Sequence, residues 1–260
     1  MFKLPQDKKG FIPFIMAGVP DLTITKEALL FLDTLNVAAI ELGVPFTDPI
    51  ADGPINQEAS NIALRNKTTL RLIFSMLDTL MECNFKTPII LFTYLNPILS
   101  LGFDQFIRLA KKANVQSVLV VDLPVEEGGD FYHQLHAEKI SPVFLVSPTT
   151  QLTRYQSVSS FAPAFIYCIS RCAVTGLKEN IRHSLADEVS TLKAFFPKES
   201  IAVGFGISTA QHAKEIVNYA DGVIVGSALM HHLNRADVNS FKSLCCDIQQ
   251  TILEVYHEKI

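Results

Sequence analysis

Eight short apolar runs alternate with helical segments along the chain, and this pattern predicts a single (β/α)8 barrel, an α/β fold of the TIM-barrel class. The length of 260 residues suits one such domain spanning residues 1–260, with its active site at the C-terminal ends of the strands. An open doubly wound sheet is the alternative. Closure is favoured because no Gly-x-Gly-x-x-Gly follows the first run and no low-complexity linker divides the chain.

The predicted strands are apolar on both faces, which is typical of strands buried in a parallel sheet. They span 11–16, 38–42, 88–92, 117–121, 142–146, 164–168, 201–204 and 222–225. Between them, amphipathic helices are predicted at 26–35, 69–83, 104–113, 185–196, 209–219 and 241–255. The spacing of Ser208 and Gln211 also predicts a capping box at the start of the 209–219 helix.

The charge balance and the cysteines exclude several classes of protein. The 22 basic and 26 acidic residues give a net charge of −4, which offers no attraction for nucleic acid or an anionic membrane. The five cysteines form no Cys-x-x-Cys pair, so we expect reduced thiols and a cytoplasmic protein. For His133 with His136, and for His231 with His232, solvated helix faces are favoured over a metal site. No signal peptide or membrane-spanning helix is predicted.

Glycines recur after the last three predicted strands. Gly176, Gly206 and the pair Gly226–Ser227 stand where the loops at the top of a barrel bind phosphate through backbone N–H groups. Tight turns between strand and helix are the alternative for any one of these glycines. Their recurrence at three consecutive strand ends favours a phosphate site. Arg171 is either a phosphate ligand or loop clamp, or a surface cation.

Two carboxylates near the second predicted strand are candidates for acid and base catalysis. Glu41 lies inside an apolar run, so we expect partial desolvation to raise its pKa toward neutrality, although a structural carboxylate is an equal alternative. Asp52 lies in a loop rich in Gly and Pro, where we expect solvent and backbone donors to keep it ionised. For Asp48, in Thr-Asp-Pro, a turn-forming role is favoured over chemistry.

The segment Glu41-Leu-Gly-Val-Pro-Phe-Thr-Asp-Pro-Ile-Ala-Asp-Gly-Pro54 closely resembles the signature of the tryptophan synthase alpha subunit family. Other matching segments follow in order over essentially the whole chain, namely 121–127, 148–150, 170–176, 204–208 and 226–228. The resemblance implies a lyase that cleaves indole-3-glycerol phosphate to indole and glyceraldehyde 3-phosphate.

The resemblance also implies roles for individual residues. Glu41 matches the principal acid and base, and Asp52 matches the carboxylate that accepts the indole N–H. Gly176, Gly206, Gly226 and Ser227 match the phosphate cradle. The positions that match the indole pocket are Phe14, Tyr94, Leu119, Tyr167 and Phe205. No metal or cofactor is implied for this subunit.

A partner is implied as well. The family assembles as an αββα heterotetramer with a beta subunit that carries pyridoxal phosphate and joins indole to serine. Loops around 52–61 and 171–180 are implied to close over the site, with Thr175 hydrogen-bonding the aspartate that Asp52 matches. Such closure excludes water and couples the two subunits.

Three positions depart from the family pattern, namely Val19, Gly128 and Ala173, and none of them removes a catalytic or phosphate residue. Ala173 adds a methyl group to the 171–180 loop and puts its closure in question. One alternative function is a catalytically weak alpha-like subunit that acts mainly as an allosteric activator of the beta subunit. Another is a different phosphate-binding barrel, whose catalytic set would be placed differently.

Overall fold

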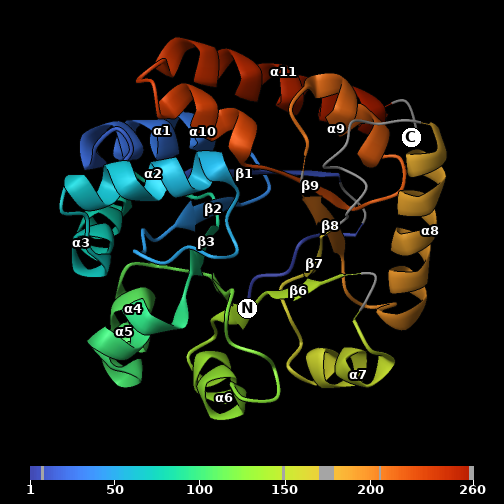
Figure 1. Cartoon of the computed structure of the whole chain (residues 1–260), viewed down its shortest axis with the longest axis horizontal. Coiled ribbons are helices and arrows are strands. Elements are labelled where there is room, and N and C mark those ends of the chain that lie inside the picture. The colour runs from blue at the N-terminus through green and yellow to red at the C-terminus, as the bar shows by residue number, and fades with distance from the viewer. Residues whose placement is uncertain (7–8, 148–149, 170–178, 205, 258–260) are drawn as a thin grey trace.

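Parallel strands in the centre of the molecule are surrounded by helices, as Figure 1 shows. The computed structural model describes residues 1–6, 9–147, 150–169, 179–204 and 206–257. Its strands are β1 (Gly10–Met16), β2 (Ile40–Gly43), β3 (Ile89–Thr93), β4 (Ser117–Val120), β5 (Ser141–Pro142), β6 (Phe144–Val146), β7 (Ile166–Ile169), β8 (Ile201–Gly204) and β9 (Gly222–Val225). All the strand pairs are parallel, and the predicted barrel class is confirmed.

The fifth strand of the barrel is interrupted, where the sequence predicts one strand over 142–146. β5 pairs with β4 and β6 pairs with β7, so the continuous segment 141–146 joins the two edges of the sheet. Pro142 has no N–H group to donate to a neighbouring strand, which explains why the ladder breaks beside it.

The helices lie outside the strands and alternate with them in the chain (Figure 1). They are α1 (Leu22–Thr34), α2 (Pro54–Arg65), α3 (Leu70–Met81), α4 (Leu95–Leu101), α5 (Phe103–Lys112), α6 (Gly129–Ala137), α7 (Leu152–Ser160), α8 (Glu179–Phe195), α9 (Ala210–Ile216), α10 (Ser227–Leu233) and α11 (Val238–His257). The six predicted helices correspond to α1, α3, α5, α8, α9 and α11. The helices α2, α4, α6, α7 and α10 were not among those predicted from the sequence.

Two local expectations are corrected. Thr209 caps α9, because its hydroxyl accepts a hydrogen bond from the N–H of His212 at 3.2 Å, so the capping box predicted at Ser208 is wrong. The loop implied around 52–61 ends early, because α2 already begins at Pro54. Proline suits this first helical position, where a missing N–H removes no helical hydrogen bond.

Alternation along the strands gives the barrel a separate interior. Ile12, Ile90 and Leu119 belong to a buried cluster inside the ring, together with Val143, Phe165, Tyr167, Ala202 and Ile224. Side chains of opposite parity, such as Ile15 and Leu42, pack outward in the larger cluster that includes the helices. This period of two determines which side chains reach the top of the barrel.

Two of the three departures from the family pattern, Val19 and Gly128, lie in the described residues. Val19 is fully buried in the core between β1 and α1. At Gly128, just before α6, an added Cβ would lie 2.4 Å from Cε2 of Tyr132. The Tyr132 ring therefore fills the space that a larger residue would need. Ala173 lies outside the described residues.

Candidate active site

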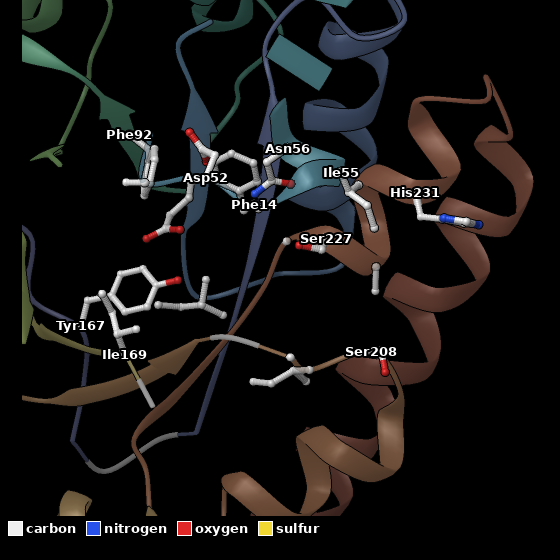
Figure 2. Close-up of a pocket in the computed structure, with 18 of the residues that line it drawn as sticks. Phe14, Asp52, Ile55, Asn56, Phe92, Tyr167, Ile169, Ser208, Ser227 and His231 are labelled. Atoms are coloured by element: carbon white, nitrogen blue, oxygen red, sulfur yellow. The ribbon is translucent and has the colours of Figure 1, made fainter. Parts of the chain in front are cut away.

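A cavity of about 500 Å³ opens at the C-terminal ends of the strands. Side chains alternate along each strand, so Phe14, two residues after the inward-facing Ile12, also points inward and lines the cavity. Glu41 and Phe92 line the cavity for the same reason. Figure 2 shows Asp52 and Tyr167 on one side of the cavity and Ser208 and His231 on the other. Of the predicted site residues, the lining includes Phe14, Glu41, Asp52, Tyr167, Gly206, Gly226 and Ser227.

Glu41 is buried at the base of this cavity, with only 1% of its surface exposed. It pairs in register with Phe14 on one side and with Ile90 on the other, so apolar strands flank it. Its Oε1 atom is buried and has no hydrogen-bond partner among the described residues. Burial raises the pKa of the carboxyl from 4.5 to about 8. The group is therefore mostly protonated at neutral pH, and it can exchange a proton there.

Asp52 lies in a different environment, just before α2. The Tyr94 hydroxyl donates a hydrogen bond to its Oδ2 at 2.8 Å, and the Asn56 side chain hydrogen-bonds the carboxyl as well. Partial burial nevertheless raises its pKa, and these two hydrogen bonds oppose that rise. Solvent and backbone donors were expected around Asp52, whereas the structure gives two side-chain donors and partial desolvation.

Tyr167 lies close to both carboxyl groups. Burial, together with the nearby Glu41 and Asp52, raises the pKa of its phenol, so the hydroxyl stays protonated and can donate. Its ring lies against Gly204, where an added Cβ would be 2.2 Å from the Tyr167 oxygen. Phe14 and Phe92 form a second aromatic wall, with ring centroids 5.3 Å apart at 80°. A flat apolar ring with one polar edge suits this end of the cavity.

The cavity lining also includes the described part of the predicted phosphate cradle. Gly206 has φ of +69°, a left-handed conformation that favours glycine, and it lines the cavity with Gly226 and Ser227. These residues follow β8 and β9. Thr175, Gly176, Phe205 and Arg171 lie outside the described residues, so their predicted roles stay predictions.

Leu119 and Tyr94, two predicted indole-pocket residues, are adjacent to the cavity but are not among its lining residues. Leu119 belongs to the barrel interior. Tyr94 lies behind the cavity wall, where its hydroxyl donates a hydrogen bond to Asp52. Several further residues line the cavity that were not predicted from the sequence, including Asn56, Phe92, Val121, Leu145, Ile169 and Ser208. Alternation along the strands could have found Phe92, Val121 and Leu145, because each follows an inward-facing residue by two positions.

The other candidate features are the histidine pair on α10, a metal site, a membrane-spanning helix and Asp48. His231 is exposed and His232 is partly exposed on helix α10, as expected for a solvated helix face, and both also border the cavity. No cluster of three or more His, Cys, Asp or Glu side chains within the described ranges is arranged to hold a metal ion. No helix in that same part of the chain is long and apolar enough to cross a membrane. Asp48 is exposed and accepts a hydrogen bond from Thr47 at 2.6 Å.

Sequence and structure comparisons find relatives that match nearly the whole chain. A family model described as tryptophan synthase alpha chain matches residues 2–254. The tryptophan synthase alpha chain of Pyropia yezoensis is 40% identical over 249 residues, which cover 94% of each chain. Tryptophan synthase subunit alpha from Legionella pneumophila superposes with a TM-score of 0.88 at 31% identity, over 95% of this chain and 94% of that one. A chain of the tryptophan synthase complex from Pyrococcus furiosus gives 0.82 at 34% identity, over 95% and 99%. This chain belongs to the tryptophan synthase alpha chain family.

Proposed function

We propose that the chain is a carbon–carbon lyase that cleaves indole-3-glycerol phosphate to indole and D-glyceraldehyde 3-phosphate. The observation that carries the proposal is the pairing of a buried carboxyl, Glu41, with a hydrogen-bonded carboxyl, Asp52, in one cavity. Family membership supports lyase activity, and the two environments support a division of labour between acid and electrostatic stabiliser.

Glu41 serves as the acid in the first step. Its protonated carboxyl gives a proton to C3 of the indole ring, which leaves positive charge on the ring nitrogen. Asp52 accepts the ring N–H and stabilises that charge, an effect that is large in a site with little water. The aromatic walls of Phe14, Phe92 and Tyr167 hold the ring between the two groups.

Glu41 serves as the base in the second step. Its carboxylate removes the proton from the side-chain hydroxyl next to the ring. The oxygen lone pair then forms the aldehyde carbonyl while the bond to C3 breaks, and its electrons return to the ring. Indole leaves neutral, glyceraldehyde 3-phosphate carries the new aldehyde, and Glu41 is again protonated. No external oxidant or reductant is needed.

The phosphate group is assigned to the opposite end of the cavity. Backbone N–H groups at Gly206, Gly226 and Ser227, with the Ser227 hydroxyl, are suited to bind it, and Gly176 would join them. This site needs no metal or cofactor in our scheme. The cradle fixes the glycerol chain so that its reacting hydroxyl lies near Glu41.

A beta subunit is the proposed partner. One related structure is of the tryptophan synthase α2β2 complex of Pyrococcus furiosus, described in terms of mutual activation. By analogy, this chain would form an αββα assembly and pass indole to a subunit that uses pyridoxal phosphate. Thr175 would hydrogen-bond Asp52 as the 171–180 loop closes. The free thiols of the described cysteines accord with a cytoplasmic enzyme.

The test is indole release from indole-3-glycerol phosphate, measured with the purified chain alone and with its beta subunit added. Slow release that rises about tenfold or more with the partner is expected from closure of the site. Absence of release in both conditions, with beta activity still stimulated, would instead make the chain an allosteric activator. Absence of both effects would refute the assignment of substrate and partner together.

A further inference from the structure

Asp52 is held by side chains from two separate parts of the fold. Tyr94 stands between β3 and α4, and its hydroxyl donates to Asp52 Oδ2 at 2.8 Å. Asn56 lies in the first turn of α2, four residues after Asp52. Figure 2 shows the Asn56 side chain beside Asp52 at the edge of the cavity. Neither residue belongs to the 171–180 loop.

Tyr94 is itself fixed in place. The backbone N–H of Ala51 donates to its hydroxyl oxygen at 3.1 Å, which leaves the hydroxyl proton for Asp52. Its ring packs against Phe46, with centroids 5.0 Å apart. Only 3% of the Tyr94 surface is exposed. The phenol therefore reaches Asp52 from behind the cavity wall, and the substrate side of the carboxyl stays open.

The orientation of the Asn56 side-chain amide is a second observation that links Asn56 to Asp52. Its Oδ1 atom is buried without a hydrogen-bond partner among the described residues, a costly arrangement for an amide. The reverse orientation would point Oδ1 at the Asp52 carboxylate, which is itself only an acceptor. The amide N–H therefore faces the carboxylate, and this hydrogen bond lowers the pKa of Asp52. Gln57 adds a second link, since its Nε2 donates to the Asp52 backbone oxygen at 2.9 Å.

We propose that Tyr94 and Asn56 are positioning residues that form a two-sided clamp on Asp52 and orient it before substrate binds. The role of the clamp in catalysis rests on the proposed function, in which Asp52 presents an ionised oxygen to the N–H of the indole ring. The contacts of the clamp lie within this chain and do not depend on the identity of the substrate. It predicts that Asp52 is in place without help from the 171–180 loop.

The direct test is the titration of the Asp52 carboxyl carbon by NMR in the full chain labelled with ¹³C-aspartate, with the signal assigned from Asp52→Asn. Tyr94→Phe and Asn56→Leu each remove one donor to the carboxylate. Each should move the Asp52 midpoint upward by about 1 pH unit. Nearby titratable side chains are retained in these variants, namely Glu41, Tyr167, Asp122, His231 and His232.

Matched controls separate positioning from general damage. Tyr132→Phe removes a buried hydroxyl that donates to the Leu123 backbone oxygen at 2.8 Å, far along the chain from Asp52. Asn61→Leu makes the same change as Asn56→Leu on the exposed side of α2. Neither control should move the Asp52 midpoint. Equal movement in the controls, or no movement in Tyr94→Phe and Asn56→Leu, would overturn the clamp.

The pH profile of kcat/KM for indole release gives a second readout. In Tyr94→Phe and Asn56→Leu, the midpoint of the acid limb should shift to higher pH together with the Asp52 titration. The midpoint of the alkaline limb, set by Glu41 near pH 8, should not change. Movement of both limbs together would contradict a local effect on Asp52. If the unmodified chain releases no indole, the proposed function fails, while the NMR titration still decides the clamp.

Discussion

Replacing Glu41 by Gln tests whether the folded chain keeps this carboxyl protonated at neutral pH. Below about pH 4.5 the group holds its proton in both the folded and the unfolded chain. Between 4.5 and about 8 the unfolded chain loses that proton while the folded chain keeps it, so stability falls as pH rises. Because glutamine does not titrate, Glu41→Gln lacks this dependence.

The size of the effect follows from the two pKa values of Glu41. Each pH unit between 4.5 and about 8 lowers the unfolding free energy by about 1.4 kcal/mol through this group alone. At pH 7 the accumulated loss is about 3 kcal/mol, a large fraction of the stability of a typical domain. Relative to the unmodified chain, Glu41→Gln should therefore gain about 3 kcal/mol between pH 4.5 and pH 7.

Urea denaturation followed by circular dichroism, from about pH 4.5 to pH 8, measures this difference. Glu27→Gln on the exposed face of α1 is the matched control, because its carboxyl is hydrated in both states. Its curve should run parallel to that of the unmodified chain. A Glu41→Gln curve that also runs parallel would show that Glu41 ionises normally in the folded state, and its role as acid would fall. Indole release should be abolished in the same variant.

Three further substitutions test the rest of the site. Asp52→Asn should lower kcat for indole release by about 10²–10³-fold, because a neutral amide stabilises the ring cation poorly; a near-normal kcat would assign that task to another group. Ser227→Asp should raise KM at least tenfold through repulsion of the phosphate, and an unchanged KM would place the phosphate elsewhere. Gly204→Ala should destabilise the chain by about 1–3 kcal/mol, because the new methyl group would lie 2.2 Å from the Tyr167 oxygen; unchanged thermal stability would contradict that packing.

The fold could be predicted because its signal lies in local apolar runs. Buried parallel strands such as β8 and β9 are read correctly from four consecutive residues, since nothing polar interrupts them. The helix α2 was missed because it begins with Pro54 directly after Gly53, and this Gly-Pro pair reads as a turn, although proline is favoured at a first helical position. Short helices such as α4 and α10 carry too few turns for a clear apolar stripe.

The site was predicted less completely, because its decisive contacts join distant residues. The burial of Glu41 could be read from its apolar neighbours in the sequence. The bond from Tyr94 to Asp52 could not, since 42 residues separate them and only the pairing of β2 with β3 brings the end of β3 beside the loop that follows β2. The family resemblance placed Tyr94 near the ring but did not indicate that it bonds the carboxylate.

The different properties of the two carboxyl groups follow from where each stands in the barrel. A side chain that points inward from a strand meets other inward side chains, and the backbone donors around it are already used by the sheet, so Glu41 has little to stabilise its charge. A residue between a strand and a helix can be reached by side chains from neighbouring elements, and Asp52 gains Tyr94 and Asn56 in this way. One position therefore favours a protonated acid and the other a carboxylate. Exchanging the two residue types would not exchange their roles, because the environment of each position sets the charge.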